Sequence, residues 1–430
     1  MLRLKGWFQT LTSWQLVPLV PLVVPLLFPE RVPGVLVILA LLGLPVLWLV
    51  SRLGSGAFVP ATPLDLPWLV VLVVTLGTLL VTAVPDLALP QVYKILIALA
   101  LYYGAVNTLG SEARLARAGI AILVAALAIA AVGLAGMGPG GSTLASLSGA
   151  LGVDLSGLIT PFWNPSGFNP NIVGGTLAVM LPLTLAYAWG TPGWRRVPLI
   201  AALLAEGAAL ALTQSRGAIL GFGAGAACVA LARDRRWGLV LPGVAAAGAV
   251  VLAIYPGPVL DLVTGGGGGI VDSAQGRLEL WSRALAMMAD FPFTGVSMGS
   301  FGRALWLLYP LATVGPGTVL EHAHNLVLQI GTDLGLPGLV AWLAQMALLL
   351  WMGVGAVRRA RGGSLWPLAA GLLGGLVAYL VHGLTDSFTY YAKGHTVVWS
   401  CLSVIAALWL VLQGRMQGGM QGAAGAAGAE

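Results

Sequence analysis

The stretch LVLQIGTDLGLPGLVAWLAQMALLLWMGV, residues 326–354, decides the class of fold to which this chain belongs. The hydrocarbon core of a bilayer is about 30 Å thick, and an α-helix needs roughly 20 predominantly apolar residues to cross it. Runs of this kind recur along almost the whole chain. Hydrophobic residues make up 58% of the 430 residues and charged residues only 8%, whereas soluble domains carry about 25% charged residues. The composition therefore indicates an all-α polytopic integral membrane protein.

The apolar runs predict about twelve transmembrane helices. Their expected boundaries are 14–29, 33–52, 67–84, 92–109, 117–136, 171–190, 196–213, 217–232, 237–255, 326–354, 365–383 and 396–413. The first run is rich in proline and lacks a small-residue cleavage site, so we interpret it as a retained helix and not as a signal peptide. A β-barrel is not expected, because its strands alternate in hydropathy and do not form solid apolar blocks.

The distribution of Lys and Arg predicts the orientation of these helices. Fourteen of the 21 basic residues fall on one side and seven on the other. Loops rich in Lys and Arg stay cytoplasmic, so both termini should be cytoplasmic. The chain then divides into nine helices at 1–255, an outward-facing loop domain at 256–325, three helices at 326–413 and a disordered cytoplasmic tail at 414–430. Because the basic residues fall in short loops between helices, the net charge of +6 does not indicate nucleic-acid binding.

The outward-facing loop is predicted to contain a short helix that ends before Pro292. Glu279 and Arg283 are spaced to form an i, i+4 pair. One face of this helix would carry Arg277, Trp281, Ala284, Leu285 and Met288. Such a stripe is typical of a helix that lies on a membrane or covers a cavity.

Scarce titratable residues gather at the outward-facing helix ends. The chain has four histidines, and two of them lie one residue apart in EHAHNLVLQI, Glu321–Ile330, where the tenth helix begins. The other polar residues expected at this surface are Arg216, Arg277, His382, Asp386, Lys393 and His395. They are far apart in sequence, yet a common membrane surface allows them to share a pocket.

These residue types favour one kind of chemistry. The guanidinium of Arg presents a planar fork of donors that matches phosphate oxygens, and a neutral His is a suitable general base near neutral pH. Together they indicate transfer of a group from a lipid diphosphate carrier to an acceptor hydroxyl. No outer loop carries the paired carboxylates that hard cations prefer, so we predict a reaction without a metal or other cofactor.

Each of these residues also has a structural interpretation. Arg216 could be a helix-end cation that reaches lipid headgroups, and Arg277 could pair with Asp272 or Glu279. His322 and His324 could form a zinc site with Glu321. Asn325 is well placed to cap the tenth helix. A carboxylate such as Glu206 inside a predicted span is a functional candidate because of its cost, but it could also serve as a structural hydrogen-bonding group.

The order of these motifs resembles the O-antigen ligase and O-antigen polymerase family of bacterial inner-membrane glycosyltransferases. Three blocks carry the likeness: TQSRGAILGF at 213–222, GRLELWSRALAMMADFPFTGVSMGSF at 276–301, and HAHNLVLQIGTDLGLPGL at 322–339. Two weaker blocks agree with it, FNPNIVGGTLAVMLP at 168–182 and VHGLTDSFTYYAKGH at 381–395. The first five predicted helices show no specific likeness.

The resemblance implies a twelve-helix protein of the inner membrane whose large loop and active site face the periplasm. It implies an undecaprenyl-diphosphate-linked glycan as donor and metal-independent transfer with inversion. By this likeness, Arg216 and Arg277 would bind the donor diphosphate and His324 would be the catalytic base. His322, Asn325 and Asp386 would support the site or the acceptor side. Aromatic residues could stack on sugars or form an interfacial belt, namely Trp281, Phe301, Tyr390 and Tyr391.

The function expected from this likeness is that of an O-antigen ligase, which joins the glycan to lipid A–core in lipopolysaccharide synthesis. A polysaccharide polymerase and a protein O-oligosaccharyltransferase are alternatives, because the quoted blocks are shared by all three. A transporter of lipid-linked sugars is an alternative from another class. Transporters commonly show internal repeats, and the two halves of this chain show no convincing repeat.

Overall fold

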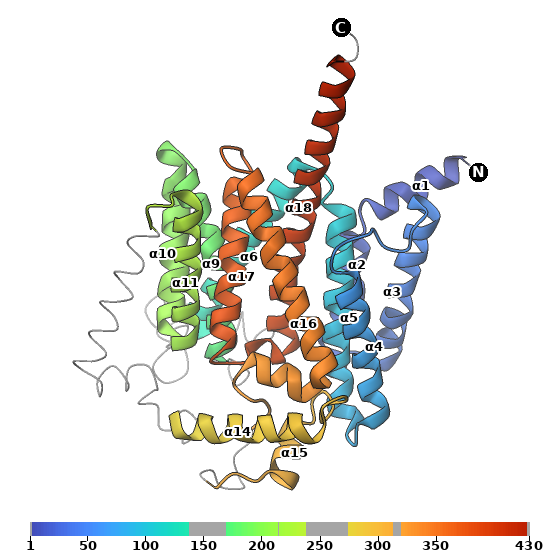
Figure 1. Ribbon diagram of the computed structural model, residues 1–430, viewed down its shortest axis with the longest axis vertical. Helices are drawn as coiled ribbons and strands as arrows, with labels where there is room; N and C mark the ends of the chain where they lie inside the picture. Colours follow the sequence, from blue (N-terminus) through green and yellow to red (C-terminus); the bar gives the residue numbers. More distant parts are fainter. Residues whose placement is uncertain (1, 137–168, 214, 238–273, 313–319, 428–430) are drawn as a thin grey trace, which may run out of the picture.

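A computed structural model describes residues 2–136, 169–213, 215–237, 274–312 and 320–427 of the chain (Figure 1). Within these ranges the secondary structure is helical and contains no strand. The α-helices are α1 (Leu2–Thr12), α2 (Leu16–Leu27), α3 (Gly34–Ser55), α4 (Asp65–Val81), α5 (Pro85–Thr108), α6 (Glu112–Gly136), α9 (Pro170–Gly190), α10 (Val197–Leu212), α11 (Arg216–Arg233), α14 (Ala274–Asp290), α15 (Phe301–Leu308), α16 (Leu326–Arg359), α17 (Trp366–Gly383) and α18 (Ala392–Ala427). Three 3-10 helices join them: η1 (Pro29–Arg31), η3 (Gly193–Arg196) and η5 (Phe388–Tyr390).

The helices confirm an all-α polytopic membrane protein. Among the described residues, eight helices are long and apolar enough to cross a bilayer, or nine if the pair bent by 53° near the N-terminus is one span. Helices α4 and α10, with 17 and 16 residues, coincide with predicted spans but are shorter. The ninth predicted span, 237–255, lies outside the described residues except for Trp237, so the count of twelve stays a prediction.

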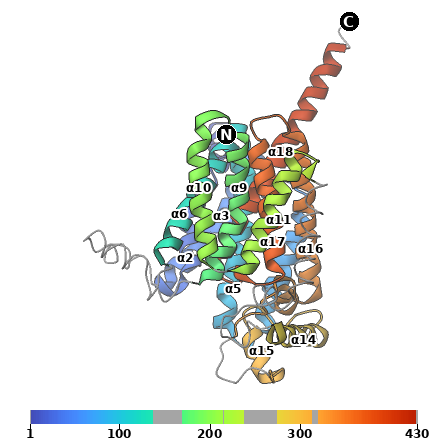
Figure 2. The same cartoon turned by 90° about the vertical axis from the view of Figure 1, so that its left-hand side faces the viewer.

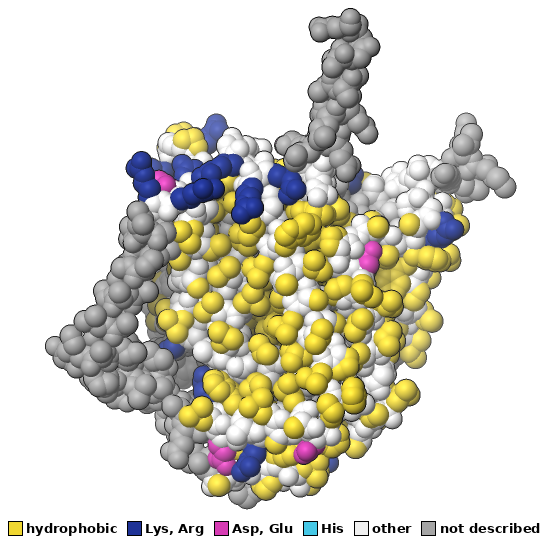
Figure 3. All heavy atoms as spheres, viewed as in Figure 1, with side chains coloured by type: hydrophobic (Ala, Val, Ile, Leu, Met, Phe, Trp, Pro, Cys, Tyr) yellow, Lys and Arg dark blue, Asp and Glu magenta, His cyan; other side chains and the backbone are white. Residues whose placement is uncertain are grey.

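The long helices run side by side, and the loop segment covers one end of them. Figures 1 and 2 show α14 and α15 beyond the same end of the bundle, with α14 lying across the helix ends. On the face drawn in Figure 3, apolar side chains cover the middle, and most Lys and Arg side chains gather at the opposite end. This is the distribution expected of a protein that crosses a membrane between a basic surface and the surface that carries α14.

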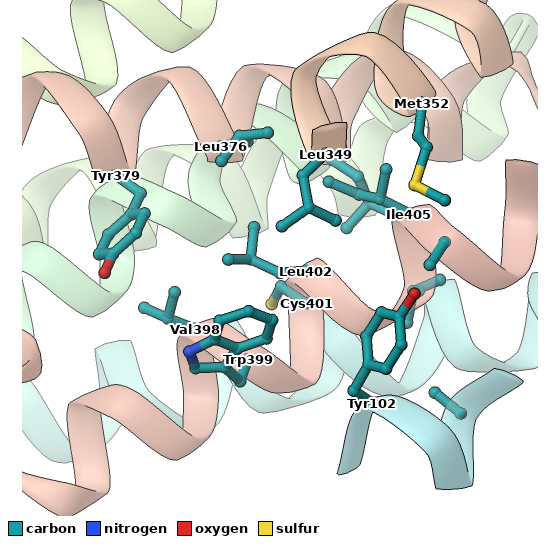
Figure 4. Close-up of a cluster of buried hydrophobic side chains, with 14 of the residues drawn as sticks. Tyr102, Leu349, Met352, Leu376, Tyr379, Val398, Trp399, Cys401, Leu402 and Ile405 are labelled. Atoms are coloured by element: carbon teal, nitrogen blue, oxygen red, sulfur yellow. The ribbon is translucent and has the colours of Figure 1, made fainter. Parts of the chain in front are cut away.

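Close packing in the bundle depends on small residues. A Cβ on Gly374 would lie 2.8 Å from the carbonyl oxygen of Gly225, so α11 and α17 touch through their backbones. Glycine permits such an approach between membrane helices. Elsewhere, large side chains from α5, α16, α17 and α18 fill the core, among them Tyr102, Leu349 and Trp399 (Figure 4).

Helix α16 is broken near its start, and the break anchors the loop segment. Gly335 has φ 67° and ψ −173°, a conformation that favours glycine, and Pro337 follows. The break leaves the carbonyl of Thr332 and the N–H of Leu336 free to pair outside the helix. Thr332 O accepts a hydrogen bond from the N–H of Val296 at 2.7 Å, and Leu336 N–H donates to Pro292 O at 2.7 Å.

A small apolar core holds α14 and α15 against the segment that precedes α16. Its buried members are Leu280, Ala284, Met287, Phe301, Leu305, Leu311, Leu320 and Ala323. Glu279 and Arg283 form the expected i, i+4 pair at 3.5 Å. On α14, Leu280, Ala284 and Met287 are buried in this core, whereas Leu285 of the predicted stripe is 56% exposed.

The proposed domain boundaries stay predictions. Of the loop domain at 256–325, the structure describes 274–312 and 320–325. Helix α18 continues to Ala427, past residue 413, where the last span was expected to end.

Candidate active site

The two histidines of the EHAHN motif lie in a turn just before α16. Asn325 caps this helix, because its side-chain oxygen accepts a hydrogen bond from Leu328 N–H at 3.1 Å. Its amide Nδ2 also donates to Leu384 O at 3.0 Å. The expected capping role of Asn325 is therefore confirmed, and the same side chain ties the histidine turn to the end of α17.

The backbone of this turn is held in a strained conformation. His324 has φ 48°, in the left-handed region that non-glycine residues seldom adopt. Such a residue persists only where its surroundings fix it. Both backbone polar groups of Ala323, the preceding residue, are hydrogen-bonded to side chains. Its N–H donates to Gln329 Oε1 at 2.7 Å, and its carbonyl accepts from Trp281 Nε1 at 3.1 Å. These two side chains, from α16 and α14, fix the peptide that orients His324.

His324 is paired with Asp386 from the turn after α17. Its Nδ1 lies 3.3 Å from Asp386 Oδ1, an ion-pair distance that is long for a hydrogen bond. Asp386 is buried and also accepts the N–H of Ser387 at 2.7 Å. Burial alone would raise the pKa of Asp386, but the contact with His324 and the nearby imidazoles outweigh it and hold that pKa below its usual range. The carboxylate therefore stays ionised beside the imidazole.

His322 packs against His324 and accepts a hydrogen bond from its backbone. Its ring centroid is 4.2 Å from that of His324, and its Nδ1 accepts the N–H of His324 at 3.3 Å. Burial, reinforced by the neighbouring His324, lowers the pKa of His322 to about 4. The ring is therefore neutral at physiological pH, which suits its role as a hydrogen-bond acceptor. It also lies against Tyr390 and Tyr391, with centroid distances of 5.4 and 5.9 Å.

Both predicted arginines approach the turn that carries Asp386. Arg277, on α14, donates from its guanidinium to Thr385 O at 2.9 Å. Arg216 is the first residue of α11, and the next residue, Gly217, packs against Thr385. A Cβ on Gly217 would lie 2.8 Å from His382 Nδ1, which explains why the motif reads SRG. Arg277 therefore contacts the turn that carries Asp386, and Arg216 begins the helix whose next residue packs against the same turn.

Residues 199–343 match the model of a family described as O-antigen ligase. This segment, about a third of the chain, is similar to the O-antigen ligase family. The chain is also similar to an O-antigen ligase of Pseudomonas aeruginosa, with 27% identity over 248 residues. That alignment covers 56% of this chain, and the chain spans 55% of the length of the curated relative.

The segment that matches the O-antigen ligase family contains all three strong blocks of the resemblance. Arg216, Arg277 and His324 therefore lie within the family match, and the expected resemblance to the O-antigen ligase family is confirmed. Asp386 lies beyond residue 343, in one of the two weaker blocks. Its association with His324 comes from the folded structure.

Three donor groups at the histidine turn could converge on a metal ion. One ligand atom each from His322, His324 and Asp386 lies within 4.8 Å of the others. The third residue is not Glu321, as the zinc alternative supposed, because Glu321 accepts the hydroxyl of Tyr391 at 3.0 Å. We interpret the group as a His–His–Asp cluster in which His324 pairs with Asp386 and Asp386 Oδ1 also accepts a backbone N–H.

Some residues expected at the same surface lie elsewhere. Lys393 is exposed, with its ammonium 5.4 Å from the ring of Phe28. His395 lines a small internal cavity of about 50 Å³ together with Lys94. Phe301 is fully buried, so it cannot stack on a sugar. Glu206 is fully buried within α10.

The sequence analysis missed the polar groups behind the histidine turn. Gln329 Nε2 donates to Asp333 Oδ1 at 2.9 Å, and Lys94 Nζ donates to Tyr390 O at 3.0 Å. Gln329, Asp333 and Lys94 line the same internal cavity. Lys94 and Asp333 could have been noticed in the sequence, because ionisable residues within transmembrane helices are costly and usually have a role.

Proposed function

We propose that this protein is an inverting glycosyltransferase that moves a glycan from undecaprenyl diphosphate to an acceptor hydroxyl. The single observation that carries the proposal is the pairing of His324 with the ionised Asp386, flanked by Arg277 and by the α11 terminus that bears Arg216. A base beside two phosphate-binding cations is what such a transfer needs.

The proposed reaction is a single displacement. The acceptor hydroxyl oxygen attacks the anomeric carbon as the bond from that carbon to the diphosphate oxygen breaks, and the diphosphate leaves with the electron pair. Nδ1 of His324 faces Asp386, so Nε2 is the atom that takes the proton of the hydroxyl. Asp386 then stabilises the resulting imidazolium, and Arg216 and Arg277 stabilise the charge on the departing diphosphate.

We favour a ligase among the possible transferases. Both the matching family model and the relative from Pseudomonas aeruginosa carry the name O-antigen ligase. The proposed acceptor is therefore lipid A–core, in the synthesis of lipopolysaccharide. A polymerase that uses a second lipid-linked unit as acceptor is the alternative that the same residues would serve.

We propose that the site faces the periplasm from the inner membrane and that both termini are cytoplasmic. The support is the concentration of Lys and Arg at the end of the bundle opposite α14 (Figure 3). Cytoplasmic loops are enriched in these residues. Cysteine accessibility at Lys393 and at Arg358, on opposite ends, tests this orientation in whole cells.

A reconstituted transfer assay tests the proposed function. Purified protein receives a defined undecaprenyl-diphosphate oligosaccharide, with and without lipid A–core, and the products are read by mass spectrometry. Glycan on lipid A–core supports the ligase, and a longer glycan still on undecaprenyl diphosphate supports the polymerase. An untouched donor with every acceptor would overturn the proposal in favour of a transporter.

A further inference from the structure

An open groove of about 680 Å³ lies beside the histidine turn. It is formed by the start of α5, by α15, and by the segments around residues 320–321 and 390–391. The groove meets the histidines through Tyr390 and Tyr391, whose rings contact His322. The arginine side of the site is linked to the histidines through other residues. Arg277 donates to Thr385 O, and the next residue, Asp386, pairs with His324.

The walls of this groove combine aromatic surface with hydrogen-bonding groups. Trp306, Tyr390 and Tyr391 supply the aromatic surface. The hydroxyl of Tyr391 donates to Glu321 Oε2 at 3.0 Å, which fixes the position of both side chains. Flat aromatic faces with polar groups at their edges suit a sugar, whose C–H faces are apolar and whose hydroxyls need partners.

A second observation points to a hydroxyl-bearing ligand. The side-chain oxygen of Gln91, at the groove, is buried and accepts no hydrogen bond from the part of the chain that the structure describes. A buried acceptor left unpaired is costly. A hydroxyl donor in the groove would satisfy it. The groove also carries charged side chains of both signs, namely Arg303, Asp86 and Glu321, which can hydrogen-bond to sugar hydroxyls.

We propose that this groove is the acceptor subsite and takes a saccharide whose reacting hydroxyl lies at His324. This inference rests on the proposed function, because a displacement brings donor and acceptor to the base from separate directions. The diphosphate donor would then bind on the side of the arginines, and the acceptor would bind on the side of Tyr390 and Tyr391. Trp306 and Gln91 are the residues that hold the acceptor sugar, at a distance from the donor.

The test uses full-length protein in detergent and the soluble core oligosaccharide released from lipopolysaccharide. Its binding is measured by saturation-transfer NMR for wild type and for the variants Trp306→Ala, Trp306→Phe and Gln91→Leu. Trp194→Ala is the matched control, because Trp194 is 78% exposed in η3 and lies outside the groove. We expect Trp306→Ala to weaken binding about tenfold, as loss of an aromatic contact does, and Trp306→Phe to restore most of it.

The same variants are then assayed for transfer, first with the acceptor varied at saturating donor and then with the donor varied at saturating acceptor. We expect Trp306→Ala and Gln91→Leu to raise the acceptor KM while the donor KM stays within about twofold of wild type, since they touch only the acceptor route. Unchanged oligosaccharide binding in folded Trp306→Ala and Gln91→Leu overturns the acceptor subsite, even if transfer is normal. If wild type transfers nothing, the proposed function fails, and oligosaccharide binding alone decides the identity of the groove.

Discussion

His324 in the turn before α16 and Asp386 in the turn after α17 meet with Nδ1 and Oδ1 3.3 Å apart. Neither turn contains the pair by itself. The contact exists because Asn325 hydrogen-bonds Leu384 across the two turns. The proposed base and the carboxylate that pairs with it are thus brought together from two helix ends.

The first prediction concerns this pair. His324→Ala should lower the transfer rate by about 10²–10⁴-fold, the usual contribution of a general base. Asp386→Asn should lower it by about tenfold or more, because the amide cannot stabilise an imidazolium. Turnover in the reconstituted assay measures both. Lys393→Ala is the control, since Lys393 is exposed and away from the cluster; a His324→Ala variant with normal turnover would falsify the base assignment.

The second prediction concerns the donor. Arg277→Ala should raise the donor KM and lower kcat, and Arg277→Lys should restore little, because only the planar fork binds diphosphate oxygens in pairs. Arg283→Ala on the same helix is a matched control, since Arg283 pairs with Glu279. Donor titrations of the three variants check this. Equal effects of Arg277→Ala and Arg283→Ala would contradict a specific diphosphate contact.

The third prediction concerns the positioning of His324. Gln329→Leu leaves the buried N–H of Ala323 without its acceptor, which should cost about 1–3 kcal/mol of stability. The turn would lose its fixed orientation, so kcat should fall while both KM values change little. Gln345→Leu is the control, because Gln345 is equally buried in α16 and its Nε2 donates no hydrogen bond to the part of the chain that the structure describes. A normal kcat in Gln329→Leu would contradict this role, because it would show that the remaining contacts, including the hydrogen bond from Trp281, hold His324 in place without Gln329.

The fourth prediction is a pH dependence of stability. The pKa of His322 falls from 6.5 to about 4 on folding. Below pH 6.5, His322 therefore binds a proton in the unfolded chain but not in the folded protein. The free energy of unfolding falls as the pH is lowered between these two values. At about 1.4 kcal/mol per pH unit, the loss approaches roughly 3 kcal/mol. Asp386, with its lowered pKa, titrates below this window.

Thermal unfolding in detergent between pH 7.5 and pH 4.5 measures this dependence. His322→Gln removes the titrating group, so its unfolding temperature should fall less with acid than that of wild type. Parallel pH profiles for the two proteins would mean that His322 is protonated as easily in the folded state as in the unfolded chain.

The fifth prediction concerns metals. Treatment with a chelator should leave transfer unchanged, because the proposed mechanism gives the leaving-group role to arginines. Added Zn²⁺ should inhibit by competing for His322, His324 and Asp386, whose ligand atoms lie within 4.8 Å of one another. Loss of turnover on chelation, with recovery on Zn²⁺, would replace the hydrogen-bonded cluster by a catalytic metal site.

Much of the fold follows directly from the sequence. A backbone in hydrocarbon must satisfy its hydrogen bonds internally, so long apolar runs form helices. The predicted run at 365–383 is helix α17, Trp366–Gly383, and the run at 33–52 is α3, Gly34–Ser55. The break in α16 was not expected, because Gly335 is stabilised there by contacts with Pro292 and Gly295, which are remote in sequence.

The candidate site was predicted in composition and only partly in geometry. His322, His324 and Arg277 could be singled out because charged and titratable residues are scarce in so apolar a chain. Hydropathy cannot say which of several polar residues at one surface will touch. His395 turns into an internal cavity, whereas Asp386 reaches His324.

The sequence by itself determined the helices and the short list of polar residues, because apolar length and charge act locally along the chain. Only the tertiary structure decided that Asp386 pairs with His324, that Gln329 and Trp281 hydrogen-bond to the backbone of Ala323, and that a groove lies at Trp306. These contacts depend on how each helix is rotated about its axis and where α16 breaks. Both are set by packing between segments that are distant in sequence.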